Sequence, residues 1–195
     1  MSAQPPFITV VSGVPRSGTS LMMQMLAAGG FPPLADDERP ADPSNPKGYF
    51  EFDPVKRLRL DRSWLDRANG HTVKIIHLLL RELPADGQFN YRVLMMIRPL
   101  TEVVASQTAM LERSGKKSAP AEALMATYQN QLRDVRDWLG RHDCFQCMDV
   151  PYHDLLKQPQ YTAHRINDFL GTRLDVEAMA SAVTPALCHH RSDAT

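Results

Sequence analysis

Short apolar segments alternate with longer amphipathic segments along the chain, and this order sets the expected fold. The apolar segments 7–12 (FITVVS) and 91–97 (YRVLMMI) are typical of buried strands, and further strands are expected at 72–76 and 144–150. Helices are expected between and after them, at about 18–28, 53–69, 100–111, 118–139, 160–170 and 176–182. Because strands that alternate with helices build parallel sheets, the pattern predicts a three-layer α/β fold, with a central parallel sheet flanked by helices.

Composition limits the possible functions without naming one. The 195 residues carry 22 Lys and Arg against 22 Asp and Glu, so the formal net charge is zero. This length favours one domain over residues 1–195, and a neutral chain lacks the positive field that nucleic-acid binding uses. No apolar run is long enough to span a membrane, and the first cation is Arg16, which argues against a secretory signal. With three cysteines, an odd number, the sequence predicts a cytoplasmic protein.

The most informative segment is Gly13-Val14-Pro15-Arg16-Ser17-Gly18-Thr19-Ser20, which lies between an expected strand and an expected helix. Its two glycines allow backbone N–H groups to turn toward a tetrahedral anion, and the helix dipole adds positive potential. A nucleotide-triphosphate loop would have Lys in place of Thr19, whereas the cation here lies inside the loop, at Arg16. The strand 91–97 is followed by Arg98 and not by the Asp that helps to hold magnesium, so we expect an anion site without a metal.

The segment PRSGTS, residues 15–20, resembles the 5′-phosphosulfate loop of sulfotransferases that use 3′-phosphoadenosine 5′-phosphosulfate (PAPS). The resemblance covers about residues 7–171 and implies a P-loop type of fold. It also implies in-line transfer of a sulfuryl group to a hydroxyl or amine acceptor, with adenosine 3′,5′-bisphosphate (PAP) as product. Arginine and backbone dipoles can stabilise this group without a metal, because it carries less charge than a terminal phosphoryl group. The resemblance assigns phosphosulfate binding to Pro15, Arg16, Ser17, Gly18, Thr19 and Ser20, and Arg16 would act in catalysis as an electrostatic clamp.

Later segments extend the resemblance to the rest of the cofactor. Arg98 and Ser106 match, in type and spacing, the Arg and Ser that hold the 3′-phosphate in this family. Tyr152, in a Tyr-His-Asp-Leu segment after the last main strand, resembles the family's tyrosine near the adenine. The late basic loop of cytosolic members has no close equivalent here, and Arg191 is the expected substitute.

Two residues are candidates for the base that takes the acceptor's proton. Glu51 ends a Gly-Tyr-Phe-Glu segment that resembles bacterial members, in which a Glu base has a similar place. His77 follows Lys74 by three residues, which departs by one residue from the Lys-x-His segment of cytosolic members. Histidine has the more suitable pKa, but the motif around Glu51 matches better. We therefore keep both candidates and prefer Glu51.

Two other functions fit parts of the same pattern. A P-loop nucleotide kinase or NTPase would share the strand, loop and helix, but the absent loop Lys and magnesium-binding Asp disfavour it. A non-catalytic protein that binds PAPS or PAP would keep the loop and would need no base. The motifs do not specify the chemical class of the acceptor. The proline-rich segment 31–50 is expected to shape the acceptor pocket. Because the chain is short, we expect an open acceptor site, or one completed by a second subunit of a homo-oligomer.

Overall fold

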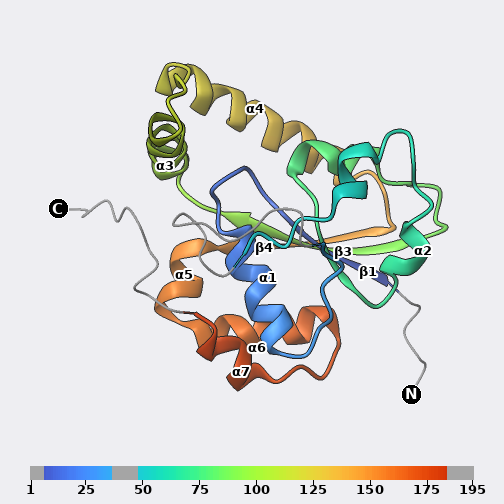
Figure 1. Ribbon diagram of the computed structural model, residues 1–195. Helices are drawn as coiled ribbons and strands as arrows, with labels where there is room; N and C mark the ends of the chain where they lie inside the picture. Colours follow the sequence, from blue (N-terminus) through green and yellow to red (C-terminus); the bar gives the residue numbers. More distant parts are fainter. Residues whose placement is uncertain (1–6, 37–47, 184–195) are drawn as a thin grey trace.

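The computed structural model describes residues 7–36 and 48–183. Within these residues the sheet has four strands, which are β1 (Phe7–Ser12), β2 (Thr72–Lys74), β3 (Asn90–Ile97) and β4 (Phe145–Pro151). All pairs are parallel and the order across the sheet is β2-β1-β3-β4 (Figure 1). The chain therefore runs from β1 outward to β2 and then returns to β3 on the other side of β1. The strand order reverses between β1 and β3, which is where open parallel sheets form a ligand crevice.

The two central strands bury side chains on both faces, because successive residues of a strand point to opposite sides. Val10 of β1 is paired in register with Val93 of β3, and both belong to the core on one face. The next pair, Val11 and Leu94, belongs to the core on the other face. Both strands are continuously apolar because each face of the sheet is covered by a hydrophobic core.

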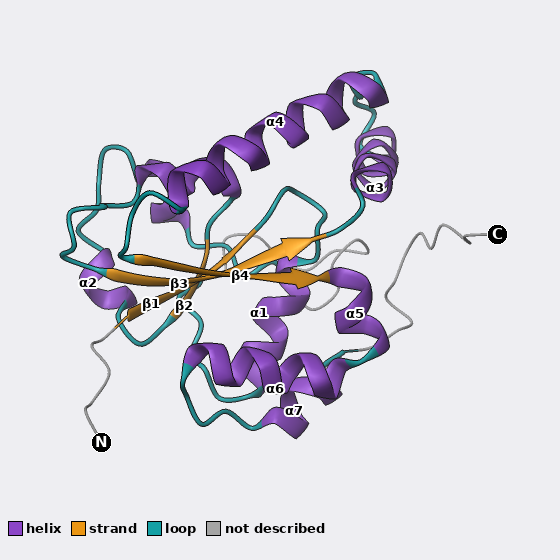
Figure 2. Cartoon of the chain, turned by 180° about the vertical axis from the view of Figure 1, so that it is seen from behind, coloured by secondary structure: helices purple, strands orange, loops and turns teal. Residues whose placement is uncertain are grey.

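Helices cover both faces of the sheet and confirm the expected three-layer α/β arrangement (Figure 2). One layer contains α1 (Thr19–Ala28), α5 (Tyr152–Lys157), α6 (Pro159–Leu170) and α7 (Val176–Ser181). The other contains the short 3-10 helices η1 (Asp53–Arg57) and η2 (His77–Glu82) together with α2 (Leu65–Ala68) and α4 (Ala121–Leu139). The remaining helix, α3 (Leu100–Arg113), packs on α4 near the end of the sheet that carries the strand arrowheads.

The helix expected over 53–69 is wrong, because this segment forms η1, a turn and the single helical turn of α2. Asp61 lies between the two pieces, and its carboxylate accepts hydrogen bonds from both the backbone N–H (2.9 Å) and the hydroxyl (2.7 Å) of Ser63. These local bonds also lower the pKa of the Asp61 carboxyl, the Ser63 hydroxyl more than the Ser63 N–H. A side chain that bonds two residues ahead offers the backbone an alternative to the helix.

Other boundaries lie close to expectation, with two additions. The strand expected over 72–76 ends at Lys74, and the following residues enter η2, which the apolar pattern did not predict. The chain also turns directly from β4 into α5 at Tyr152, so the segment that carries Tyr152 is helical.

Candidate functional site

The predicted anion-binding segments meet at the carboxyl end of the sheet, where the strand order reverses. The loop 13–18 leaves β1 and enters α1, and Arg98 directly follows β3. In Figure 2 the strand arrows point toward the start of α3 and α5, which follow β3 and β4. Residues that are more than eighty positions apart in the sequence therefore lie at the crevice where a ligand site is expected.

The loop backbone has the form of an anion cradle. Arg16 has a φ of 70° and Gly18 a φ of 102°, so both residues adopt left-handed conformations. The N–H of Ser17 donates to the Val14 carbonyl at 3.2 Å, which closes a turn inside the loop. The N-cap of α1 is Gly18, and no side chain among the described residues caps the helix there, so its first N–H groups fit a ligand. A left-handed arginine is costly, and strain of this kind is concentrated at functional sites.

Ser17 supplies a buried hydroxyl that no described residue satisfies. Its side chain is fully buried, and its Oγ has no hydrogen-bond partner among the described residues. The hydroxyl lies against Gly13, where an added Cβ would approach it to 2.4 Å and the Met96 carbonyl to 3.0 Å. A buried hydroxyl without a partner is unfavourable, so the loop fits a ligand that carries anionic oxygens.

Arg98 is held at the rim of this loop by three contacts. Its Nε donates to Glu102 Oε2 at 2.9 Å, and one of its terminal nitrogens donates to the Arg16 carbonyl at 3.2 Å. Its guanidinium lies 4.6 Å from the centre of the Tyr152 ring. The Arg98 and Glu102 side chains are 7% and 6% exposed, so the pair is almost fully desolvated. His153 Nε2 contacts the other oxygen of Glu102 at 2.8 Å.

The structure joins residues that the sequence assigned to two different parts of the cofactor. Arg16 Nε donates to Ser106 Oγ at 3.1 Å, and Ser106 is buried on α3. Arg16 was expected at the phosphosulfate and Ser106 at the 3′-phosphate, so the two expected subsites are contiguous. Tyr152 was expected at the adenine. Its ring packs on Gly18, where an added Cβ would come within 2.6 Å of the ring.

Lys74 brings a third cation to the loop from the end of β2. Its Nζ donates to Ser20 Oγ at 3.2 Å and to the Tyr49 carbonyl at 2.8 Å. The lysine therefore ties the start of α1 to the segment 48–51, which contains Glu51. Sequence reasoning did not place Lys74 among the cofactor residues, and its position three residues before His77 was the available signal.

The two candidate bases have different environments. His77 is fully buried, its Nδ1 donates to the Gly13 carbonyl at 3.2 Å, and its Nε2 contacts Gln131 Oε1 at 2.9 Å. Glu51 is half-buried, and its carbonyl accepts from the Asp36 N–H at 2.9 Å. The preceding residue, Phe50, has a φ of 52°, so the backbone beside Glu51 is in the left-handed region.

The remaining expectations concern single residues, a metal ion and a membrane span. Pro15 and Thr19 lie in the loop and at the first residue of α1, both half-buried, whereas Arg191 lies outside the described residues. Within residues 7–36 and 48–183, no three His, Cys, Asp or Glu side chains gather as a metal ion would need. In the same part of the chain, every helix is too short or too polar to cross a bilayer.

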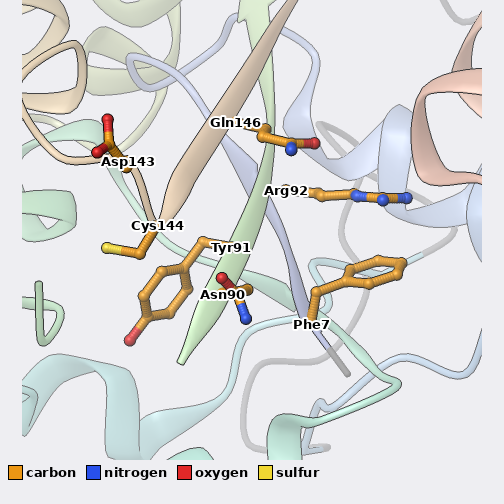
Figure 3. Close-up of a pocket in the computed structure, with 7 residues that line it drawn as sticks. All are labelled: Phe7, Asn90, Tyr91, Arg92, Asp143, Cys144 and Gln146. Atoms are coloured by element: carbon orange, nitrogen blue, oxygen red, sulfur yellow. The ribbon is translucent and has the colours of Figure 1, made fainter. Parts of the chain in front are cut away.

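A shallow cavity of about 220 Å³ lies at the opposite, amino end of the sheet (Figure 3). Figure 3 shows Tyr91 and Cys144 on one side of the strands, and Phe7, Arg92 and Gln146 on the other. The two groups point to opposite sides of the strands instead of meeting at a point. The carboxyl end is therefore the better candidate site, because there side chains from the loop, α3 and α5 converge.

Comparisons with known proteins bear on the family and the fold. A model of the sulfotransferase family matches residues 72–176, which is more than half of the chain. The sulfotransferase domain of the olefin synthase of Synechococcus PCC 7002 is 17% identical, with a TM-score of 0.56 over 95% of this chain and 87% of that one. The sulfotransferase STF1 of Mycobacterium tuberculosis H37Rv is 18% identical, with a TM-score of 0.60 over 93% and 72%. Such identities show a shared fold, and no curated protein matched the chain.

Proposed function

The chain belongs to the sulfotransferase family, and on that premise we propose that it transfers a sulfuryl group from PAPS to a hydroxyl or amine acceptor. One observation carries the proposal. Arg16, Arg98 and Ser106 converge beside a loop whose buried Ser17 hydroxyl lacks a partner among the described residues. This is the donor set that a molecule with two separate anionic groups needs.

The proposed binding roles follow from the contacts. The N–H groups at the start of α1, with the hydroxyls of Ser17, Thr19 and Ser20, would hold the phosphosulfate. Arg98 and Ser106 would hold the 3′-phosphate, and Arg16 bridges both groups because its side chain contacts Ser106 from within the loop. Pro15 and Gly18 shape the loop. Tyr152 packs under Arg98 and on Gly18, so it supports the site and presents only a small exposed area to an adenine.

The bound donor supplies a sulfuryl group whose leaving group is PAP. As the acceptor oxygen or nitrogen bonds to sulfur, the bond from sulfur to the phosphate oxygen breaks, and the acceptor loses a proton to a base. Arg16 keeps its charge throughout because a guanidinium does not deprotonate in proteins, so it stabilises charge and donates no proton. Lys74, at Ser20, would add a further positive charge beside the start of α1.

We propose Glu51 as the base. Lys74 holds the Tyr49 carbonyl and Ser20 together, so the segment that carries Glu51 is fastened to the start of α1. His77, by contrast, is fully buried and uses both ring nitrogens in contacts with Gly13 and Gln131. A base must reach a substrate proton. We therefore propose that His77 fixes the Gly13 end of the loop.

Two competing functions are tested by ligand choice. A nucleotide kinase or NTPase would be stabilised by Mg-ATP, whereas the proposed enzyme should be stabilised by PAP. Thermal unfolding with each ligand separates them, and stabilisation by Mg-ATP alone contradicts the proposal. A protein that only binds PAPS or PAP would show the PAP effect without transferring sulfate.

Transfer itself is measured with radiolabelled PAPS and a panel of hydroxyl and amine acceptors. We expect Arg16→Ala to lower the transfer rate about a thousandfold, because it removes a charge aimed at the developing negative charge. An Arg16→Ala enzyme with a near-native rate would contradict the assignment.

A second pair of variants distinguishes the bases. We expect Glu51→Gln to lower the transfer rate about a hundredfold or more at unchanged PAP affinity, as loss of a general base does. His77→Gln serves as the matched variant, and we expect it to lower the free energy of unfolding more than the rate. The reverse outcome would make His77 the base.

A further inference from the structure

Glu102 is a buried carboxylate beside the proposed 3′-phosphate site, where a negative charge opposes binding. Both of its oxygens are used. Oε2 accepts from Arg98 Nε at 2.9 Å, and Oε1 accepts from His153 Nε2 at 2.8 Å. The donor-binding roles above account for Arg98 but give no reason for His153. The first contact joins residues four positions apart, across the junction of β3 and α3, whereas the second joins residues 51 positions apart.

The charge of this triad depends on the protonation of one residue. The charges of Arg98 and Glu102 sum to zero, so with a neutral imidazole the triad of Arg98, Glu102 and His153 has no net charge with which to attract a phosphate. With an imidazolium the triad carries one net positive charge. Because the carboxylate is only 6% exposed, solvent screens it weakly, and the difference between the two states acts strongly on a nearby anion.

We propose that His153 takes up a proton when the 3′-phosphate of a nucleotide binds at Arg98 and Ser106. The inference rests on the proposed function, because it takes these two residues as the phosphate ligands. Nε2 carries the hydrogen that is donated to Glu102, so the added proton enters at Nδ1. The His153 side chain is 38% exposed, which gives solvent protons access to the ring. His153 is thus a positioning residue that sets the charge of the Arg98–Glu102 pair.

Among the charged groups around the pair, His153 is the one whose charge we expect to change. The charged or titratable side chains on the loop and on the elements that pack around the pair include Arg16 of the loop, Asp149 of β4, Asp154 and Lys157 of α5, and His164, Arg165 and Asp168 of α6. Tyr152 is adjacent, with its ring centre 5.8 Å from that of His153. Among these residue types only histidine titrates between about pH 6 and about pH 8.5. His164 is exposed on α6, so it provides a matched control.

Isothermal titration calorimetry measures the proposed proton directly. PAP is titrated into the whole protein at about pH 7 in buffers that differ in ionisation enthalpy, and the slope gives the number of protons taken up. We expect the wild-type protein and His164→Gln to take up more protons per PAP than His153→Gln. Adenosine 5′-monophosphate, which lacks the 3′-phosphate, should show no such difference.

Affinity gives a second readout with a definite sign. A group that is protonated in the complex raises affinity at low pH, and the gain is lost as the pH rises through its titration. We therefore expect His153→Gln to bind PAP about tenfold more weakly than wild type at about pH 6 and equally at about pH 8.5. Taking the ratio of the two proteins cancels the titration of the phosphate itself.

A second variant keeps the test decisive if His153→Gln does not fold. Glu102→Gln removes the charge that the proton balances, so its proton uptake should fall to the same low value. Equal proton uptake by the wild type and by a folded variant that binds PAP would overturn the inference and leave the proposed function intact. Failure of the wild-type protein to bind PAP at all would overturn both.

Discussion

Two arginines at opposite ends of β3 show how differently the two ends of the sheet are used. Arg98 follows the carboxyl end of β3, and Arg92 lies near its amino end. Each guanidinium lies over an aromatic ring, at 4.6 Å from Tyr152 for Arg98 and at 4.1 Å from Phe7 for Arg92. By residue type, strand and ring contact the two are nearly equivalent.

Their other contacts separate them. Arg98 contacts the loop carbonyl of Arg16 and the carboxylate of Glu102, so it belongs to a network that ends at the anion cradle. Arg92 donates to the backbone carbonyl of Leu170, the last residue of α6, and burial lowers the pKa of its guanidinium. We interpret Arg92 as a fastener between the sheet and α6. A partly buried arginine indicates a binding site only when the side chains around it point toward the same site.

Of the variants that compare the two ends of the sheet, Arg98→Met should lower PAP affinity the most, because it removes the charge proposed for the 3′-phosphate while keeping an apolar side chain over Tyr152. We expect PAP affinity to fall about a hundredfold, in the range of a lost charge-assisted hydrogen bond and its ion pair. Calorimetric titration with PAP measures it, with Arg92→Met as the matched variant. Equal losses of affinity in both variants would erase the distinction between the two ends.

Two glycines, one near each end of the sheet, extend the comparison to the backbone. Gly18, in the loop, has a φ of 102°, and an added Cβ would lie 2.6 Å from the Tyr152 ring. Gly87, before the amino end of β3, has a φ of 85° and open space around it. We expect Gly18→Ala to lower the free energy of unfolding by about 3 kcal/mol and to weaken PAP binding, because strain and a clash add.

Gly87→Ala introduces backbone strain without a steric clash. It should lower the free energy of unfolding by about 1 kcal/mol without a change in PAP affinity. Chemical denaturation and calorimetry of both variants supply the test. A Gly18→Ala protein as stable as Gly87→Ala would show that the loop does not pack on Tyr152 as described.

Arg92→Met should have a small effect, and it should change stability and not ligand binding. It loses a hydrogen bond to the Leu170 carbonyl but keeps part of the contact with Phe7, so we expect the free energy of unfolding to fall by about 1–2 kcal/mol. PAP affinity should stay within about twofold, since the variant removes no group near the loop. A larger loss of affinity than of stability would assign Arg92 to the ligand site.

Much of the sheet was predictable, because its signal is local. Each of the strands β1 and β3 is a single continuous segment of the sequence, and so is the loop between β1 and α1. A strand that is covered on both faces must be apolar throughout. The segment 53–69 was predicted as one helix because its termini carry helix signals. The hydrogen bonds that Ser63 donates to Asp61 interrupt this helix, and a pattern of apolar positions carries no information about such bonds.

By itself, the sequence determined the α/β architecture and the chemistry of the loop, since both depend on residue types at short spacing. The tertiary structure decided which distant side chains share that loop. It joined Arg16 to Ser106, Lys74 to Ser20 and Glu102 to His153, across separations of 90, 54 and 51 residues. These contacts form because parallel strands bring their carboxyl ends to one edge, and only the strand order β2-β1-β3-β4 decides which ends are neighbours.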